Sequence, residues 1–180
     1  MRPDRPFRSL STGEKLAYLL VSVIALIPFL VALSGFLLST VPLFPPVPVV
    51  PNFGLALVFL FALYRPTQIP PWAAVPLGAA ADLLYSLPLG VNAVGLPLFM
   101  AAVIWIDTNP TQLHWLADWA IAVPFLVGYE AFIWLLASIA GPSVPLLPFL
   151  IQGIATLAVF PLVAFLFVSV QRRFVDRMRV

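Results

Sequence analysis

The sequence contains no cysteine and a single histidine, His114, among its 180 residues. Without cysteine, the chain can form neither a disulfide nor a thiolate metal site, and it has no cysteine nucleophile. A zinc site would have one imidazole to draw on, whereas zinc sites take several nitrogen and sulfur ligands. We therefore expect this protein to use no metal and no other cofactor.

Charge is also scarce in this chain. Charged residues make up 9% and hydrophobic residues 62% of the sequence, and the mean hydropathy is +1.07. Soluble domains average about 25% charged residues, and a soluble domain of this size could not bury so much apolar surface. The net charge of +2 comes from two short basic ends, whereas nucleic-acid binding requires a broad basic face. The composition predicts an integral membrane protein without a nucleic-acid partner.

Six apolar segments are separated by proline, glycine or polar residues. A membrane-spanning helix needs about 20 apolar residues, and this length of chain allows about six such helices with short loops. The predicted fold class is all-α, a polytopic membrane helix bundle formed by one domain. We expect its six helices at 16–39, 53–64, 71–87, 91–106, 119–140 and 146–170.

The second segment, 53–64, is short for a membrane-spanning helix. At 1.5 Å per residue it covers only about 18 Å. Three explanations are open: the helix takes residues from the proline-rich stretch 41–51, it thins the bilayer locally, or it re-enters without crossing.

The basic residues predict the orientation of the bundle. They lie before the first span, after the second and behind the last, so six full crossings place all of them on one side. By the positive-inside rule, the basic N-terminus (1–15) and the basic tail (171–180) are cytoplasmic, in a bacterial inner membrane. The tail is also suited to anionic membrane lipid. The predicted cytoplasmic anchors are Arg65, Arg172, Arg173, Arg177 and Arg179.

Two carboxyl groups fall deep in predicted spans, Asp82 in the third and Glu130 in the fifth, and no span contains lysine or arginine. An isolated carboxylate in hydrocarbon costs several kcal/mol, so each must be neutral, hydrogen-bonded or facing water. Each lies about 16 Å from the cytoplasmic end of its span. We therefore expect the two groups near the middle of the membrane, where they could approach one another.

Small residues surround Asp82 on its helix. Ala74, Gly78 and Asp82 follow at four-residue spacing, which lets a neighbouring helix approach closely. An interhelical hydrogen bond is favoured over a ligand or proton site, with Tyr85, Ser86 and Asn92 as the expected donors. For Glu130 the two interpretations are balanced, and the neighbouring Tyr129 is the expected donor.

Tryptophans lie close to several predicted helix ends. Trp72, Trp115 and Trp119 flank the third and fifth segments. Tryptophan is enriched at membrane interfaces, so anchoring explains these residues better than ligand stacking does.

The stretch Gly78-Ala-Ala-Ala-Asp82-Leu-Leu-Tyr-Ser-Leu-Pro88-Leu-Gly90-Val-Asn92, with Pro51-Asn52 through Tyr64 before it, resembles the MreD family of rod shape-determining proteins. The signature is Gly78, Asp82, Pro88-Leu89-Gly90 and Asn92. It covers about a third of the chain, while the remainder agrees in length, in the number of spans and in the arginine-bearing tail.

The resemblance implies a non-catalytic membrane scaffold of cell-wall elongation that is involved in the regulation of cell shape. Its partner would be MreC, with MreB, RodA and PBP2 in the same assembly, and a homodimer is left open. The close packing that the Gly78 face allows would hold the partner's transmembrane helix. The candidate structural or partner-binding residues are Gly78, Asp82, Tyr85, Gly90, Asn92 and Glu130.

The MreD family is also similar in architecture to the substrate-binding subunits of energy-coupling-factor vitamin transporters, which supplies a rival function. Such a subunit needs a polar external pocket, and the predicted external loops are uncharged. An enzyme is a weaker third interpretation, because no serine has a histidine or lysine beside it to act as a base.

Overall fold

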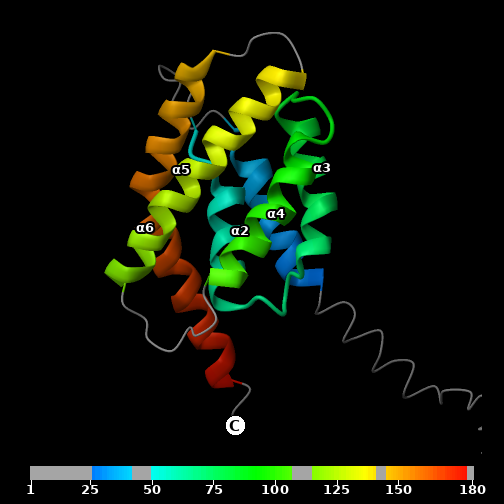
Figure 1. Cartoon of the computed structure of the whole chain (residues 1–180). Coiled ribbons are helices and arrows are strands. Elements are labelled where there is room, and N and C mark those ends of the chain that lie inside the picture. The colour runs from blue at the N-terminus through cyan, green and yellow to red at the C-terminus, as the bar shows by residue number, and fades with distance from the viewer. Residues whose placement is uncertain (1–25, 42–49, 107–114, 141–144, 178–180) are drawn as a thin grey trace, which may run out of the picture.

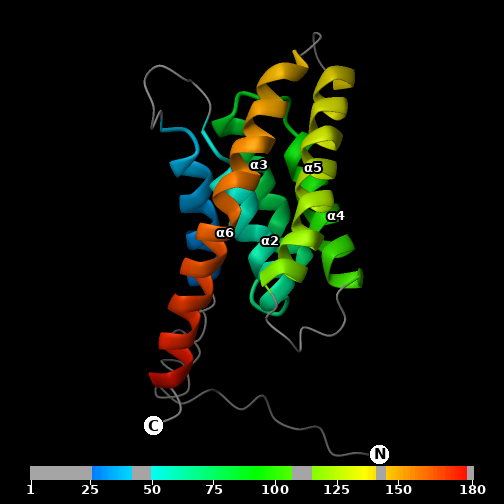
Figure 2. The ribbon, with the colours of Figure 1, turned by 90° about the vertical axis from the view of Figure 1, so that its left-hand side faces the viewer.

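The computed structural model describes residues 26–41, 50–106, 115–140 and 145–177. All regular structure within these ranges is helical, and successive α-helices run in alternating directions (Figures 1 and 2). The helices are an N-terminal helix Leu26–Leu38, α2 (Phe53–Tyr64), the 3₁₀ helix η1 (Pro71–Ala73), α3 (Ala74–Leu84), α4 (Val91–Ile106), α5 (Trp115–Ala140) and α6 (Leu146–Arg177).

The two ends of the bundle are distinct. We call the end that carries the α3–α4 connection (85–90) the turn end, and the opposite end, where α2 finishes at Arg65, the Arg65 end (Figure 1). The N-terminal helix rises toward the turn end, and α6 descends to the Arg65 end (Figure 2).

The observed helix bounds agree with the predicted ones for 53–64 and 91–106, and they correct three predicted helix ends elsewhere. Helix α5 begins at Trp115 rather than at 119, and α6 continues to Arg177 rather than ending at 170. Residues 171–177 contain neither proline nor glycine, so nothing in them stops the helix. Arg172, Arg173 and Arg177 therefore extend α6 instead of forming a separate tail, while Arg179 and residues 16–25 lie outside the described residues.

Helix α3 ends three residues earlier than predicted because Ser86 breaks it. Ser86 takes a left-handed conformation with φ 55°, and the N–H of Leu87 donates to the carbonyl oxygen of Asp82 at 2.9 Å. This is the Schellman arrangement, with serine at the position that usually holds glycine.

Helix α2 is the central helix of the bundle. Nine of its twelve residues are buried, and it contacts α4, α5 and α6. On another side, a Cβ at Gly35 of the N-terminal helix would lie 3.0 Å from the backbone of Gly54 in α2. Because other helices surround α2, its short length does not have to match the outside of the bundle.

The N-terminus of α2 lies inside the bundle. The N–H of Asn52, the residue before α2, donates to Thr156 of α6. Thr156 lies ten residues from the start of α6, a rise of about 15 Å. The helix then runs on to the Arg65 end without turning back (Figures 1 and 2). Residues 53–64 are thus a short central helix, and whether this helix crosses a membrane stays a prediction.

Aromatic side chains form the middle of the core. Phe59 of α2 packs edge-to-face on Phe160 of α6, with ring centroids 5.5 Å apart. Phe99 of α4 contacts Phe125 and Tyr129 of α5 at 5.7 and 5.0 Å. Aromatic pairs at these separations are attractive beyond the area they bury. One continuous cluster therefore joins four helices.

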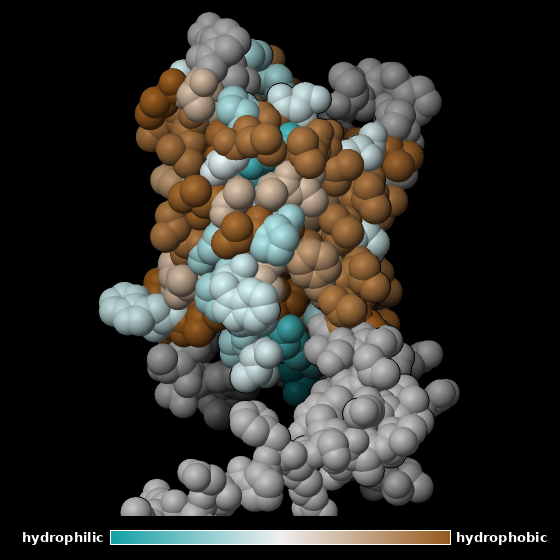
Figure 3. Space-filling model, turned by 90° about the vertical axis from the view of Figure 1, so that its right-hand side faces the viewer, coloured by the Kyte–Doolittle hydropathy of each residue, from teal (hydrophilic) through white to brown (hydrophobic). Residues whose placement is uncertain are grey.

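The outer surface is largely apolar. Large hydrophobic side chains are exposed on every α-helix except the enclosed α2, and apolar residues cover most of the flank in Figure 3, with the most hydrophilic ones toward its two ends. By length and composition, Trp119–Ala140 and Leu146–Val170 could each span a membrane.

Helices α3 and α4 pack closely because of Gly78. A Cβ at Gly78 would overlap the carbonyl group of Asn92 and would lie 2.7 Å from Cα of Ala93. Ala74 and Ala81 on the same face are completely buried. The small-residue face of α3 is therefore occupied by α4 of the same chain, which corrects the expectation that it holds a partner.

We predict that Gly78→Ala lowers the stability of the fold, since the added methyl group displaces the backbone of α4. Overpacking of this kind costs about 1 to 3 kcal/mol. Thermal unfolding of the purified protein measures the change, and Gly128→Ala is the matched control because a Cβ there meets nothing within 4 Å. Equal unfolding temperatures for the two variants would contradict the proposed packing.

Candidate functional site

Asp82 forms the most complete polar contact in the described structure. It is completely buried in the last turn of α3. Its Oδ1 accepts hydrogen bonds from the backbone N–H and the side-chain Nδ2 of Asn92, at 2.8 and 2.9 Å. Its Oδ2 accepts from the N–H groups of Gly90 and Ala93, at 2.9 and 3.3 Å. These four donors fill the acceptor sites of a carboxylate.

The donors come from the beginning of α4. The first N–H groups of a helix have no partner within the helix, and a carboxylate is stabilised beside them by the positive end of the helix dipole. Gly90, with φ +110°, gives the chain the conformation that turns its N–H toward Asp82. Asp82 therefore caps α4 from the neighbouring helix.

One of the three expected donors to Asp82 is confirmed and two are wrong. Asn92 donates twice. The hydroxyl of Tyr85 instead lies 3.4 Å from Oδ1 of Asn52, and Ser86 ends α3. Asp82 also lies two residues before the end of α3, at the turn end, and its depth in a membrane stays a prediction.

Asn92 extends this contact to α5. Its Oδ1 accepts a hydrogen bond of 2.6 Å from the hydroxyl of Tyr129. Both side chains are buried, so the bond fixes the rotation of α4 against α5. Tyr129 had been expected to donate to its neighbour Glu130, and its hydroxyl is directed to Asn92 instead.

A second polar group surrounds Glu130, which is 7% exposed. Its Oε1 lies 3.4 Å from Nδ2 of Asn52. The Oδ1 of Asn52 caps α2 by accepting from the N–H of Leu55 at 3.0 Å, and the Asn52 N–H donates to Thr156 at 2.8 Å. The hydroxyl of Tyr85 also reaches Asn52. Asn52 is thus the centre of this group, and Asp82 and Glu130 belong to separate sets of bonds.

Two residues that position Glu130 were absent from the sequence-based candidates. Asn52 donates to Glu130, and Thr156 accepts from the backbone N–H of Asn52. Asn52 could have been found, because asparagine directly before an apolar helix is a typical N-cap. Thr156 gives no such signal, since its role depends on how α6 is rotated. Arg65 lies apart from both groups, where its N–H caps the end of α2.

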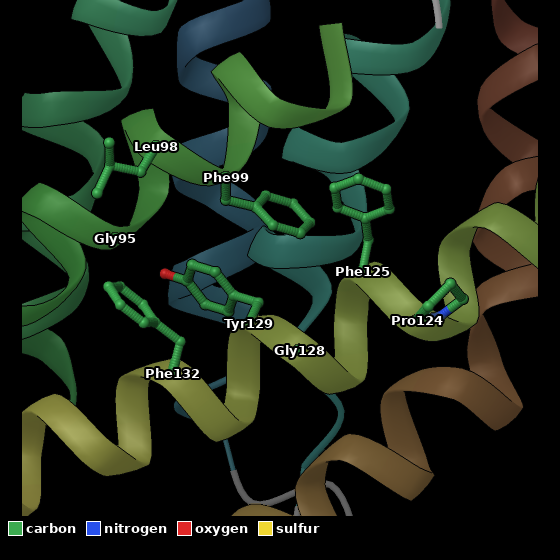
Figure 4. A pocket seen from close by; sticks show the side chains of 8 residues that line it. All are labelled: Gly95, Leu98, Phe99, Pro124, Phe125, Gly128, Tyr129 and Phe132. Carbon is green, nitrogen blue, oxygen red and sulfur yellow. The ribbon is translucent and has the colours of Figure 1, made fainter. Parts of the chain in front are cut away.

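An apolar groove lies between α4 and α5 (Figure 4). Its volume is about 350 Å³. Aromatic rings from both helices project toward it, and Gly128 leaves open space on α5. The lining residues are Gly95, Leu98, Phe99, Pro124, Phe125, Gly128, Tyr129 and Phe132. Apart from the Tyr129 hydroxyl, which already bonds Asn92, their side chains offer no polar group, so the groove fits an apolar occupant.

No protein-family model, curated protein or solved structure matches this chain. Within the part of the chain that the structure describes, no three His, Asp or Glu side chains gather where they could hold a metal ion. The interpretation of function therefore depends on the two polar groups, the groove and the apolar exterior.

We predict that Asp82→Leu destabilises the protein more than Asp82→Asn does. Leucine leaves four donors unpaired, whereas asparagine keeps one acceptor oxygen. Each buried donor without a partner costs about 1 to 3 kcal/mol. Yield and unfolding temperature of the two variants measure the difference. A leucine variant as stable as the native protein would exclude a structural role for Asp82.

Proposed function

We propose that this chain is an MreD-like scaffold of the bacterial inner membrane that holds the transmembrane helix of an MreC-like partner and has no catalytic turnover. The assembly would include MreB, RodA and PBP2, as the resemblance implies. The observation that carries the proposal is the apolar groove between α4 and α5, on a bundle whose exterior is apolar on every α-helix except the enclosed α2.

The signature residues support the resemblance because they form one structural unit. Gly78 lets α4 approach, Asp82 caps α4, and Gly90 and Asn92 supply donors to that carboxyl group. The contribution of each residue to this contact depends on the others being present. A packing unit of this kind explains why they occur together without requiring any catalytic chemistry.

The ends of the bundle support the proposed orientation. Trp72 and Trp105, which are 75% and 81% exposed, lie before α3 and at the end of α4, so both are at the Arg65 end. Trp119, 40% exposed, lies near the start of α5 at the same end. Exposed tryptophans beside arginines are typical of an interfacial belt. The tryptophans mark this end as an interface, and its arginines would make it the cytoplasmic one by the positive-inside rule.

The groove provides the helix contact that the Gly78 face does not. Ala120 and Gly128 lie eight residues apart on the exposed side of α5. Small residues in this pattern allow the backbone of a second helix to come close. Large side chains of that helix would enter the space beside Gly128, between the rings of Phe125 and Phe132.

We predict that Gly128→Leu reduces recovery of a co-expressed MreC-like single-span partner several-fold and leaves the fold intact. The leucine side chain would occupy the groove from a position where a Cβ meets nothing within 4 Å. Co-purification measures the effect. Val75→Leu is the matched control, because it enlarges an exposed side chain on α3.

Undiminished recovery with Gly128→Leu would exclude the groove as the binding face. Recovery of the native chain with an ATPase module, or stoichiometric binding of a vitamin, would favour the transporter interpretation over the scaffold.

We predict that single cysteines at Val41 and Leu89 react with impermeant thiol reagents only from outside the membrane, and that a cysteine at Thr67 reacts only from the cytoplasm. Val41 and Leu89 lie at the turn end and Thr67 at the Arg65 end. The native chain contains no cysteine, so it provides an unreactive background. Labelling of positions 41 and 67 from the same side would show that α2 does not cross.

A further inference from the structure

Four aromatic rings line the groove between α4 and α5, and one of them has no ring partner. Phe99 packs edge-to-face on Phe125 and on Tyr129, with ring centroids 5.7 and 5.0 Å apart. Phe132 pairs with no other ring among the residues that the structure describes. Phe99 and Tyr129 are buried, whereas Phe132 is 38% exposed. An exposed, unpaired ring therefore borders an otherwise paired aromatic cluster.

The space beside Phe132 is large enough for another ring. A Cβ on Gly128 meets nothing within 4 Å, and Figure 4 shows Phe125 and Phe132 on either side of this glycine. The groove has a volume of about 350 Å³. A cavity of about 150 Å³ lined by leucine, isoleucine and phenylalanine holds a benzene molecule. The groove can therefore take one aromatic side chain together with the stem that joins it to a backbone.

The surroundings of the groove decide between an aliphatic and an aromatic occupant. Lipid tails are as apolar as leucine, so in a membrane an aliphatic side chain gains little over the tail that it displaces. A ring gains in addition the edge-to-face attraction to the rings already present. This attraction corresponds to a roughly two- to tenfold difference in affinity. An aromatic side chain is therefore the occupant that the groove selects.

The level of the open space restricts where the partner carries this ring. Gly128 lies nine residues after Trp119 and twelve before Ala140, the two ends of the candidate span in α5. Aromatic belts lie at the two membrane interfaces. The ring that enters the groove therefore comes from the middle of the partner's span and not from its belt.

The exposed rings that this chain carries outside the groove do not reach the same level. The exposed tryptophans lie at the Arg65 end, and Phe165 of α6 is 69% exposed. A Cβ on Gly153 of α6 would lie 3.7 Å from Cγ of Glu130, so these two residues share one level. Phe165 is twelve residues beyond Gly153, about 18 Å nearer the Arg65 end. A second copy in the same orientation would not place this ring beside Gly128, which favours a different protein as the occupant.

We propose that the groove is a binding site for one aromatic side chain, which a single-span partner helix inserts from the middle of its span, opposite Gly128 and against the ring of Phe132. This inference rests on the proposed scaffold function and names the chemistry of its partner. Phe132 is then a specificity-determining residue, because its unpaired ring distinguishes an aromatic side chain from an aliphatic one.

Two model peptides test the proposal on the full-length chain in phosphatidylcholine vesicles. Both are single-span helices of leucine and alanine with lysines at their ends, and they differ only in having phenylalanine or leucine at the central position. Energy transfer from the tryptophans of the chain to a dansyl group on the peptide measures binding. We expect the native chain to bind the phenylalanine peptide roughly two- to tenfold more tightly than the leucine peptide.

Three variants of the chain locate the preference. Phe132→Leu should remove it, since leucine keeps an apolar side chain but has no ring. Gly128→Leu should also remove it, because the added side chain fills the space. Phe165→Leu is the matched control, since it removes an exposed ring from α6, and it should keep the preference.

Equal binding of the two peptides by the native chain, or binding of neither, overturns the inference, while recovery of an MreC-like partner still tests the scaffold separately. A preference that persists in Phe132→Leu also overturns the inference. Association between native chains that Phe132→Leu abolishes would assign the groove to a second copy instead. A clear preference for the phenylalanine peptide without recovery of an MreC-like partner would overturn the scaffold and leave the ring-binding site.

Discussion

The arrangement of the bundle depends on the contact between the Asp82 carboxylate and the N-terminus of α4. This contact closes the α3–α4 hairpin, and it forms only because Gly78 lets the two backbones come together. Asn92 then carries the bonding on to Tyr129 of α5. Three helices are thereby held in one register by groups that are all buried, where hydrogen bonds are not weakened by water.

Buried carboxyl groups without a nearby lysine or arginine need another source of stabilisation, and helix N-termini provide it here. Asp82 faces the first turn of α4, and Glu130 faces the residue that caps α2. A helix N-terminus carries about half a positive charge. Four direct donors satisfy the first carboxyl group completely. Glu130 accepts one longer bond, from the side chain of Asn52, so the two groups differ in how firmly they are held.

The sequence predicted those helix ends that are determined by residues next to them in the chain. Residues 53–64 and 91–106 were placed correctly because Arg65-Pro66 ends the first helix and Pro88-Leu89-Gly90 precedes the second. The donors of Asp82 and Glu130 were partly wrong, since nearness along the chain does not determine how neighbouring helices are rotated. Tyr85 and Tyr129 both bond residues on other elements. The Gly78 face was recognised as a close-packing surface, but sequence alone could not show that α4 fills it.

The short central helix explains why polar groups lie inside the bundle. Because α2 begins well inside the bundle, its cap brings Asn52, Glu130 and Thr156 into the interior beside the turn end. Beside these groups, aromatic and small residues line the groove between α4 and α5. A partner helix in the groove would gain many contacts worth little individually, since polar bonds between membrane helices average about 0.6 kcal/mol. Affinity would then depend on the shape of the groove, and that shape is fixed by the Asn92–Tyr129 bond between its two walls.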